Sequence, residues 1–193
     1  MRSRFIKNCP IHGAHRAIHG DFITEILSLW ERAGGKMTDD FFPYLEYLVQ
    51  FKGEYVLEDT PEIIYSGSKT LASKVLGDKW NGSSEEINSD LDLQFRSYVA
   101  EGYRAAVSDH HPVLDVISSD LRVSETESVW VTYSRLVFPM HLKTGKVLLA
   151  SLALPLQPIE IIGMQDLPDL QGNFPHTKDR GGFLLDSVPN ARP

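Results

Sequence analysis

Three segments of the chain repeat their apolar residues at the spacing of an amphipathic helix. The spacing predicts a helix over residues 21–33, for which Asp21 is a suitable N-terminal cap. It also predicts a short helix over residues 69–76 and a long one over residues 90–108. Residues 41–51 are dense in aromatic side chains, and the proline near their start favours a short helix there as well.

The second half of the chain changes to the pattern of β-strands. Residues 113–123, 129–141 and 147–159 are rich in β-branched and other apolar residues. Short polar loops join these runs and imply antiparallel neighbours, so the pattern predicts a three-stranded meander. Two shorter runs, residues 55–57 and 63–65, are separated by a turn-like segment and are expected to pair as a hairpin.

Length and composition indicate one globular domain with flanking segments. The chain has 193 residues, of which 42% are hydrophobic and 23% are charged, and such a chain can bury one core. Residues 1–20 show no periodicity and are expected to form an arm, either flexible or docked on the domain. The domain is expected to span residues 21–160. The density of proline and glycine in residues 161–193 argues against further regular structure in that tail.

Charge and cysteine content indicate the cell compartment in which the protein works and exclude some classes of partner. The formal net charge of -7 leaves no basic excess for binding the phosphates of a nucleic acid. Cys9 is the only cysteine, which excludes an intramolecular disulfide and is typical of a reducing compartment. The N-terminal residues lack the apolar stretch of a signal peptide, and the most apolar run, residues 147–156, is too short to cross a membrane. We therefore expect a soluble, cytoplasmic protein without membrane or nucleic-acid partners.

Four short motifs stand in order along the chain. They are residues 30–37 (WERAGGKM), 63–68 (IIYSGS), 75–82 (VLGDKWNG) and 136–145 (LVFPMHLKTG). These motifs, together with the order of the expected elements, resemble a bacterial stand-alone PAS family that is common in alphaproteobacteria. The resemblance covers residues 22–159. It implies an α+β fold in which a five-stranded antiparallel sheet carries helices on one face, with the N-terminal helix flanking it.

The resemblance also implies a sensory or regulatory role in signal transduction, with a pocket between the sheet and the helices. It identifies no ligand and no cofactor. Tyr103 and Trp130 are aromatic residues that can supply either pocket surface or plain core. Facing helix positions and strand parity select the candidate ligand-binding residues Ile63, Tyr65, Leu71, Phe95, Tyr98, Val99, Val116, Tyr133 and Leu152. The charged side chains of the first meander strand are expected to face solvent: Asp115, Asp120 and Arg122.

Two groups of residues raise the question of a metal or a haem. His110 and His111 follow the long helix, where they can ligate haem iron or simply complement the helix C-terminus. Flavin photochemistry is unsupported, because the only cysteine lies in the arm rather than beside the second strand. The other group is an array in the arm whose ligand types suit zinc or copper, although a solvated, histidine-rich arm is the simpler interpretation: Cys9, His12, His15 and His19.

Sequence motifs of enzymes are missing from the chain. It contains no Gly-x-Ser-x-Gly, no phosphate-binding glycine loop and no His-Glu-x-x-His, so we expect a binding protein rather than an enzyme. A small enzyme with the cone-shaped fold of ketosteroid isomerase fits less well, because a hairpin interrupts the helices that this fold needs. The main alternative is a ligand-free module that forms a homodimer, or binds a signalling protein, through the apolar stripe of the N-terminal helix: Phe22, Ile26, Leu29 and Trp30.

Overall fold

An antiparallel sheet forms the centre of the computed structural model, which describes residues 3–53, 62–77, 93–123, 128–157 and 160–162. Its strands are β1 (Phe5–Cys9), β2 (Leu48–Lys52), β3 (Ile63–Ser66), β4 (Val113–Arg122), β5 (Ser128–His141), β6 (Val147–Pro155) and β7 (Glu160–Ile162). They pair in the order β1-β4-β5-β6-β2-β3, and β7 pairs with the start of β5. Every pairing between these strands is antiparallel.

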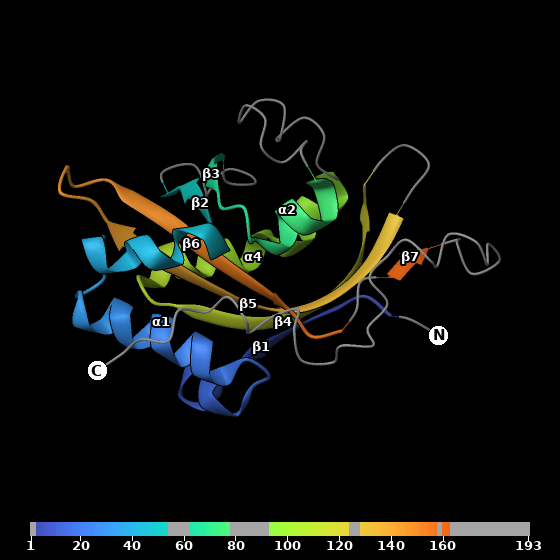
Figure 1. The fold of residues 1–193 in the computed structure, drawn as a ribbon, viewed down its shortest axis with the longest axis horizontal. Helices are drawn as coiled ribbons and strands as arrows, with labels where there is room; N and C mark the ends of the chain where they lie inside the picture. The colour runs from blue at the N-terminus through green and yellow to red at the C-terminus, as the bar shows by residue number, and fades with distance from the viewer. Residues whose placement is uncertain (1–2, 54–61, 78–92, 124–127, 158–159, 163–193) are drawn as a thin grey trace.

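Helices cover both faces of this sheet (Figure 1). On one face lie α2 (Leu71–Leu76) and α4 (Leu93–Asp109). On the other face lie α1 (Gly20–Arg32) and two 3-10 segments, η1 (Ile11–Arg16) and η2 (Asp39–Tyr47). The protein is therefore an α+β fold built on an open antiparallel sheet.

The meander divides its side chains between these two covered faces. On β5, Val131 and Tyr133 pack in the cluster with α4, whereas Leu136 and Phe138 pack in the cluster with α1. Because successive side chains of a strand point to opposite faces, residue parity decides which helices a side chain meets. Both sets are buried, so the middle of β5 is apolar at both parities, as is typical of a strand covered on both sides.

Several of the elements predicted from the sequence are confirmed by the structure. The predicted helices over residues 69–76 and 90–108 correspond to α2 and α4, and the predicted meander corresponds to β4, β5 and β6. Thr70 caps α2, since its side-chain oxygen accepts a hydrogen bond from the Ser73 amide at 3.1 Å. Gly77 follows the helix with a φ of 63°, a conformation that favours glycine.

Two parts of the sheet differ from the prediction. The predicted helix over residues 41–51 is wrong in its second half, where η2 gives way to β2 and β2 pairs with both β3 and β6. Pro43 lies inside η2, and a proline removes a backbone donor from a helix. The residues of the arm add an edge strand, because β1 pairs with β4 and Arg4 Nη2 donates to Asp120 Oδ2 at 2.7 Å. The predicted strand over residues 55–57 lies outside the described residues.

The segment that follows α1 is fixed to the end of β5. Trp30 Nε1 donates a hydrogen bond of 2.6 Å to the carbonyl oxygen of Pro139. Gly34 and Gly35 turn the chain with φ values of 59° and 69°, and a Cβ at Gly35 would lie 3.3 Å from the Trp30 ring. The His141 amide donates to the Gly35 carbonyl oxygen at 2.8 Å. The WERAGGKM motif therefore has a structural role at this corner.

The apolar stripe of α1 is buried against the protein's own sheet. Phe22, Ile26 and Leu29 belong to the core cluster on this face, and Trp30 packs against the same cluster. The stripe is therefore not the exposed surface that the predicted homodimer contact requires, because residues of the same chain already cover it. Homodimerisation itself stays a prediction.

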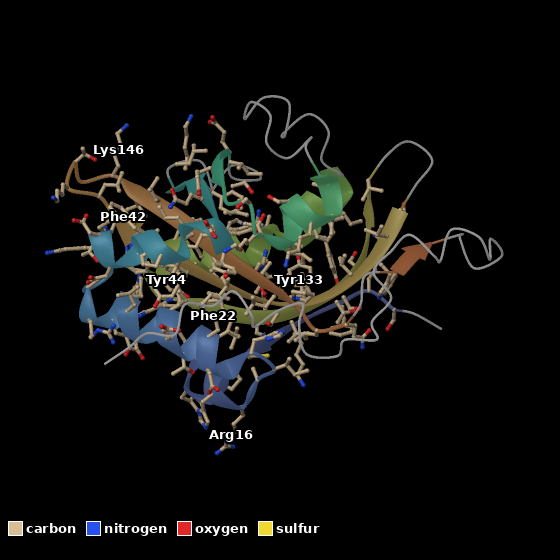
Figure 2. The ribbon with its side chains drawn as sticks, in the orientation of Figure 1. Arg16, Phe22, Phe42, Tyr44, Tyr133 and Lys146 are labelled. Atoms are coloured by element: carbon tan, nitrogen blue, oxygen red, sulfur yellow. The ribbon has the colours of Figure 1, made fainter. Side chains whose placement is uncertain are left out.

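Tyr44 ties η2 to α1. Its ring lies 6.1 Å from the ring of Phe22, and both side chains are labelled in Figure 2. Its hydroxyl donates a hydrogen bond of 2.6 Å to Glu25 Oε1 on α1. Partial burial and this hydrogen bond raise the pKa of Tyr44 to about 12, so the hydroxyl keeps its proton well into the alkaline range.

Candidate functional site

A pocket of about 120 Å³ lies between α2, α4 and the sheet face that these helices cover. Its surface is mainly aliphatic and aromatic, with a small number of polar groups, which is the usual composition of a site for a small organic ligand. The residues around it are Val49, Phe51, Ile63, Thr70, Leu71, Ala72, Val75, Leu76, Phe95, Val99, Tyr103, Leu121, Val131, Tyr133, Arg135, Ser151 and Ala153.

Five of the candidate residues chosen from the sequence meet around this pocket. Leu71 comes from α2, while Phe95 and Val99 come from successive turns of α4. Ile63 comes from β3 and Tyr133 from β5, and Figure 2 labels Tyr133 on the sheet below α2. The structure thus brings residues from four separate elements to one place.

Val116 and Leu152 lie on the opposite face of the sheet, so the assignment of both to the pocket is wrong. Leu152 is buried in the core cluster beneath α1, while its neighbour Ala153 lines the pocket. Val116 precedes Ile117, which packs with the pocket-side cluster, so strand alternation turns Val116 the other way. The expected facing of β4 and of β6 is therefore off by one residue. In a strand, a shift of one residue moves every side chain to the other face.

Tyr65 and Tyr98 are close to the pocket in sequence but do not line it. Tyr65 is 39% exposed on the edge strand β3. The pairing of β2 with β3 is irregular, since Gln50 pairs with Tyr65 but Phe51 pairs with Ile63, and this bulge breaks the simple alternation along β3. Tyr98 is half-buried and packs beside the pocket-side cluster.

The two further aromatic candidates divide between the faces. Tyr103 lines the pocket, and its ring centroid lies 4.8 Å from that of Phe51. Trp130 is not a pocket residue, because its Nε1 donates a hydrogen bond of 3.2 Å to Ser118 Oγ on the other face of β4. The long helix therefore supplies three pocket residues at a spacing of four: Phe95, Val99 and Tyr103.

Arg135 lines one wall of the pocket and belongs to a buried ion pair between β4 and β5. Arg135 and Asp115 are directly opposite each other in the strand register, and their side chains are 1% and 0% exposed. Arg135 Nε donates to Asp115 Oδ1 at 3.0 Å, and Arg135 Nη2 donates to Asp115 Oδ2 at 2.6 Å. Arg135 Nη1 donates to the carbonyl oxygen of Val99 on α4 at 2.9 Å. Such a bidentate pair fixes the guanidinium in position.

This pair corrects the expectation that Asp115 faces solvent. A carboxylate can be buried when a counter-ion and hydrogen bonds compensate for the lost water, and Arg135 supplies both. Asp120 is only half-buried and pairs with Arg4, which lowers the pKa of the Asp120 carboxyl through a hydrogen bond. The side chain of Arg122 lies outside the described residues.

The backbone of α4 reaches the guanidinium only because residue 102 is glycine. A Cβ at Gly102 would overlap Arg135 Nη2 and would lie 2.9 Å from Asp115 Oδ2. On the next residue of the helix, the ring of Tyr103 lies 4.5 Å from Arg135 Cζ, close enough for a cation–π contact. The helix, the ion pair and the pocket wall are therefore one packed unit.

Burial alters the proton affinities of the groups around the pocket. Desolvation raises the pKa of Tyr133 far above its usual value, so its hydroxyl stays protonated and remains a donor. For Arg135, burial alone would lower the pKa, but the combined effect of Tyr103, Asp115 and Tyr133 raises it. The guanidinium therefore stays charged, and the pocket wall presents hydrogen-bond donors.

The sequence analysis missed several apolar residues around the pocket and also the charged residue Arg135. A usable signal was present, because Arg135 is the only Lys, Arg, Asp or Glu within residues 129–141. A lone charge in a strand buried on both faces requires a counter-ion, and Asp115 on the neighbouring strand is a natural partner.

The candidate metal ligands of the arm are not gathered into a metal site. Within the described residues, no group of three or more His, Cys, Asp or Glu side chains is placed to hold a metal ion. His19 Nε2 instead lies 3.0 Å from the carbonyl oxygen of Pro155. His110 follows α4 with a φ of 54°, the left-handed conformation that commonly ends a helix. Its position agrees with an end-of-helix role.

Comparisons with known proteins assign no function to this chain. No protein-family model, no curated protein and no solved structure matches the chain. Among the described residues, no helix is both long and apolar enough to cross a membrane.

Proposed function

We propose that the protein is a sensory or regulatory module of the PAS type, which binds a small ligand in the pocket between α2, α4 and the sheet. The observation that carries the proposal is the cavity of about 120 Å³, whose wall combines apolar side chains with the buried guanidinium of Arg135. An apolar cavity with a few oriented polar groups is the usual form of a small-molecule site. Its role is binding rather than catalysis, and its place of action is the cytoplasm.

The order of the elements supports the PAS assignment. In the PAS fold, the first two strands and the last three form one sheet, and the helices between them close a pocket over one face. Here β2 and β3 join β4, β5 and β6 in one sheet. The helices α2 and α4 lie between these two groups of strands in the sequence and pack on the same face. By this comparison, β1 and α1 are additions to the common core.

The size of the cavity favours a ligand-binding pocket rather than a core filled by the protein's own side chains. Protein interiors contain few voids larger than a water molecule. An apolar cavity of about 150 Å³ is known to accept benzene, so a cavity of about 120 Å³ is in the range of one small ring. Because the pocket is open to solvent on one side, a ligand that enters it removes apolar side chains from water, and this burial favours binding.

The experiment compares two matched substitutions against a panel of small apolar and mixed-polarity metabolites. Ala72→Leu fills the pocket from α2, whereas Ala105→Leu makes the same change at a half-buried position of α4 that does not line the pocket. Binding at this pocket predicts that at least one panel member raises the melting temperature of the wild type and of Ala105→Leu. The same compound should give no shift with Ala72→Leu.

Two results would overturn the proposal. One is the absence of any thermal shift with the wild type across the panel. The other is a shift that Ala72→Leu retains in full, because binding would then occur outside this pocket. Ala72→Leu itself should melt at or above the wild-type temperature, since its added methyl groups contact apolar side chains of the pocket and displace only solvent.

A further inference from the structure

We propose that the ligand is an uncharged molecule about the size of one six-membered ring, which carries a hydrogen-bond acceptor that Arg135 binds at the pocket wall. This inference rests on the proposed ligand-binding function and names the chemistry of the ligand.

The first argument is the number of donors that Arg135 has left. A guanidinium has five N–H donors. Three of them are used, two in bonds to Asp115 and one in the bond to the Val99 carbonyl. Within the described residues, one N–H on Nη1 and one on Nη2 have no acceptor, and Arg135 lies on the pocket surface. A buried donor without an acceptor is costly, so a ligand that supplies an acceptor is favoured.

The second argument is the character of the other polar groups around the cavity. The Thr70 hydroxyl is already engaged, since it donates to Ser73 Oγ at 2.8 Å and accepts from the Ser73 amide. Tyr133 lines the cavity, and its raised pKa keeps its hydroxyl protonated, so this hydroxyl can donate or accept a hydrogen bond. Ser151 and Tyr103 also line the cavity, and their hydroxyls have the same double capacity. Among these lining groups Arg135 can only donate, so the matching ligand group is an acceptor such as a carbonyl oxygen.

The third argument concerns charge. Asp115 already neutralises Arg135 through two hydrogen bonds, and both side chains are almost fully buried. A carboxylate ligand would lose its hydration and would also approach the Asp115 carboxylate in a dry site. A neutral acceptor loses far less hydration and still takes the remaining N–H groups. The ion pair thus selects for an uncharged ligand.

The test uses three probes that share a six-membered ring. Cyclohexanone carries a carbonyl acceptor, methylenecyclohexane replaces that oxygen by a CH₂ group of similar shape, and cyclohexanecarboxylate carries a charge. Dissociation constants are measured by NMR titration of the full chain. The quantity of interest is the preference, defined as the dissociation constant of methylenecyclohexane divided by that of cyclohexanone.

The variants remove the donors without leaving a buried charge. The double variant Arg135→Met with Asp115→Leu removes the ion pair as a unit, which proteins often tolerate. The preference should fall about tenfold in this variant, which is the usual weight of one such hydrogen bond. Cyclohexanecarboxylate should bind wild type at least about tenfold more weakly than cyclohexanone does. Tyr133→Phe, which keeps the ring and removes only the hydroxyl, should lower the preference by a smaller factor.

A second readout needs no variant. The Nε–H signal of Arg135 should shift when cyclohexanone is added to wild-type protein and should stay in place with methylenecyclohexane. An unchanged preference in the double variant, together with an unmoved Nε–H signal, would overturn the inference. Equal or tighter binding of cyclohexanecarboxylate would overturn it as well, and so would the failure of both neutral rings to bind.

These outcomes separate the inference from the proposed function. If methylenecyclohexane binds as well as cyclohexanone in every variant and Ala72→Leu weakens both, the pocket binds ligands but Arg135 does not select them. If a panel compound of another class binds in a way that Ala72→Leu abolishes while all three rings fail, the ligand class named here is wrong and the binding function stands.

Discussion

Replacing Asp115 by leucine should lower the free energy of unfolding by about 3–5 kcal/mol, because it leaves the Arg135 guanidinium buried without a counter-ion. The magnitude follows from the geometry. Asp115 accepts two hydrogen bonds, at 3.0 and 2.6 Å, and water cannot take its place, since the two side chains are 1% and 0% exposed. For a chain of this length, such a loss lowers the melting temperature by roughly 6–20 °C.

The full test is a double-mutant cycle measured by urea unfolding. Asp115→Leu and Arg135→Met should each be strongly destabilising. The double variant should recover to within about 2 kcal/mol of wild type, because the charge is gone and only the Val99 carbonyl loses its donor. Single variants that each cost less than about 1 kcal/mol would refute the reasoning, as would costs that simply add in the double variant.

Three smaller predictions follow from other contacts. Gly102→Ala should cost about 1–3 kcal/mol in urea unfolding, although alanine favours a helix by about 1 kcal/mol, because its Cβ would overlap the guanidinium. In the double variant that lacks the ion pair, the same change should cost almost nothing, and an equal cost there would refute the clash. Gly35→Ala should destabilise more than Gly34→Ala: both have positive φ, but only the Gly35 Cβ would meet the Trp30 ring, at 3.3 Å. Equal losses on thermal melting would contradict that contact. The pKa of Tyr44 is raised from 10.0 to about 12, so the stability it adds is complete below pH 10 and is lost as pH rises through about 12. The advantage of wild type over Tyr44→Phe in unfolding free energy should therefore shrink over that window, and a constant difference would contradict the shift.

The sequence predicted well the long helix α4 and the order of the meander strands. On α4, Phe95 and Val99 share a helical face, and both line the pocket. The meander was equally clear, since three long apolar runs are joined by short polar loops and pair as successive antiparallel strands. For α4 the periodicity of the chain matches the helix, whereas the meander strands were recognised by the length of their apolar runs and by the loops between them.

The sequence could not predict which face of a doubly covered strand lines the pocket. On β6, Leu152 faces α1 and Ala153 faces the pocket, yet neither is polar, so no alternation distinguishes them. The strand β2 was not predicted for the same reason. Its residues are buried on both faces, so they do not show the alternating pattern of a half-exposed strand. Because helices cover both faces of the sheet, most residues of these two strands are buried whichever face they point to.

The ion pair was hidden for a different reason. Arg135 and Asp115 are 20 residues apart and meet only through the register of β4 with β5. Charged residues on a sheet usually face solvent, so the sequence predicted an exposed Asp115, whereas its side chain is buried. A search for lone charges inside apolar runs, paired across predicted neighbouring strands, would have identified both residues.

The central claim is that the pocket between α2, α4 and the sheet holds a small ligand, and native mass spectrometry of freshly purified protein tests it most directly. We predict that wild type and Ala105→Leu carry the same additional small mass, which denaturation releases, and that Ala72→Leu does not carry it. A wild-type spectrum with the mass of the chain alone, or an additional mass that Ala72→Leu retains, would contradict the claim.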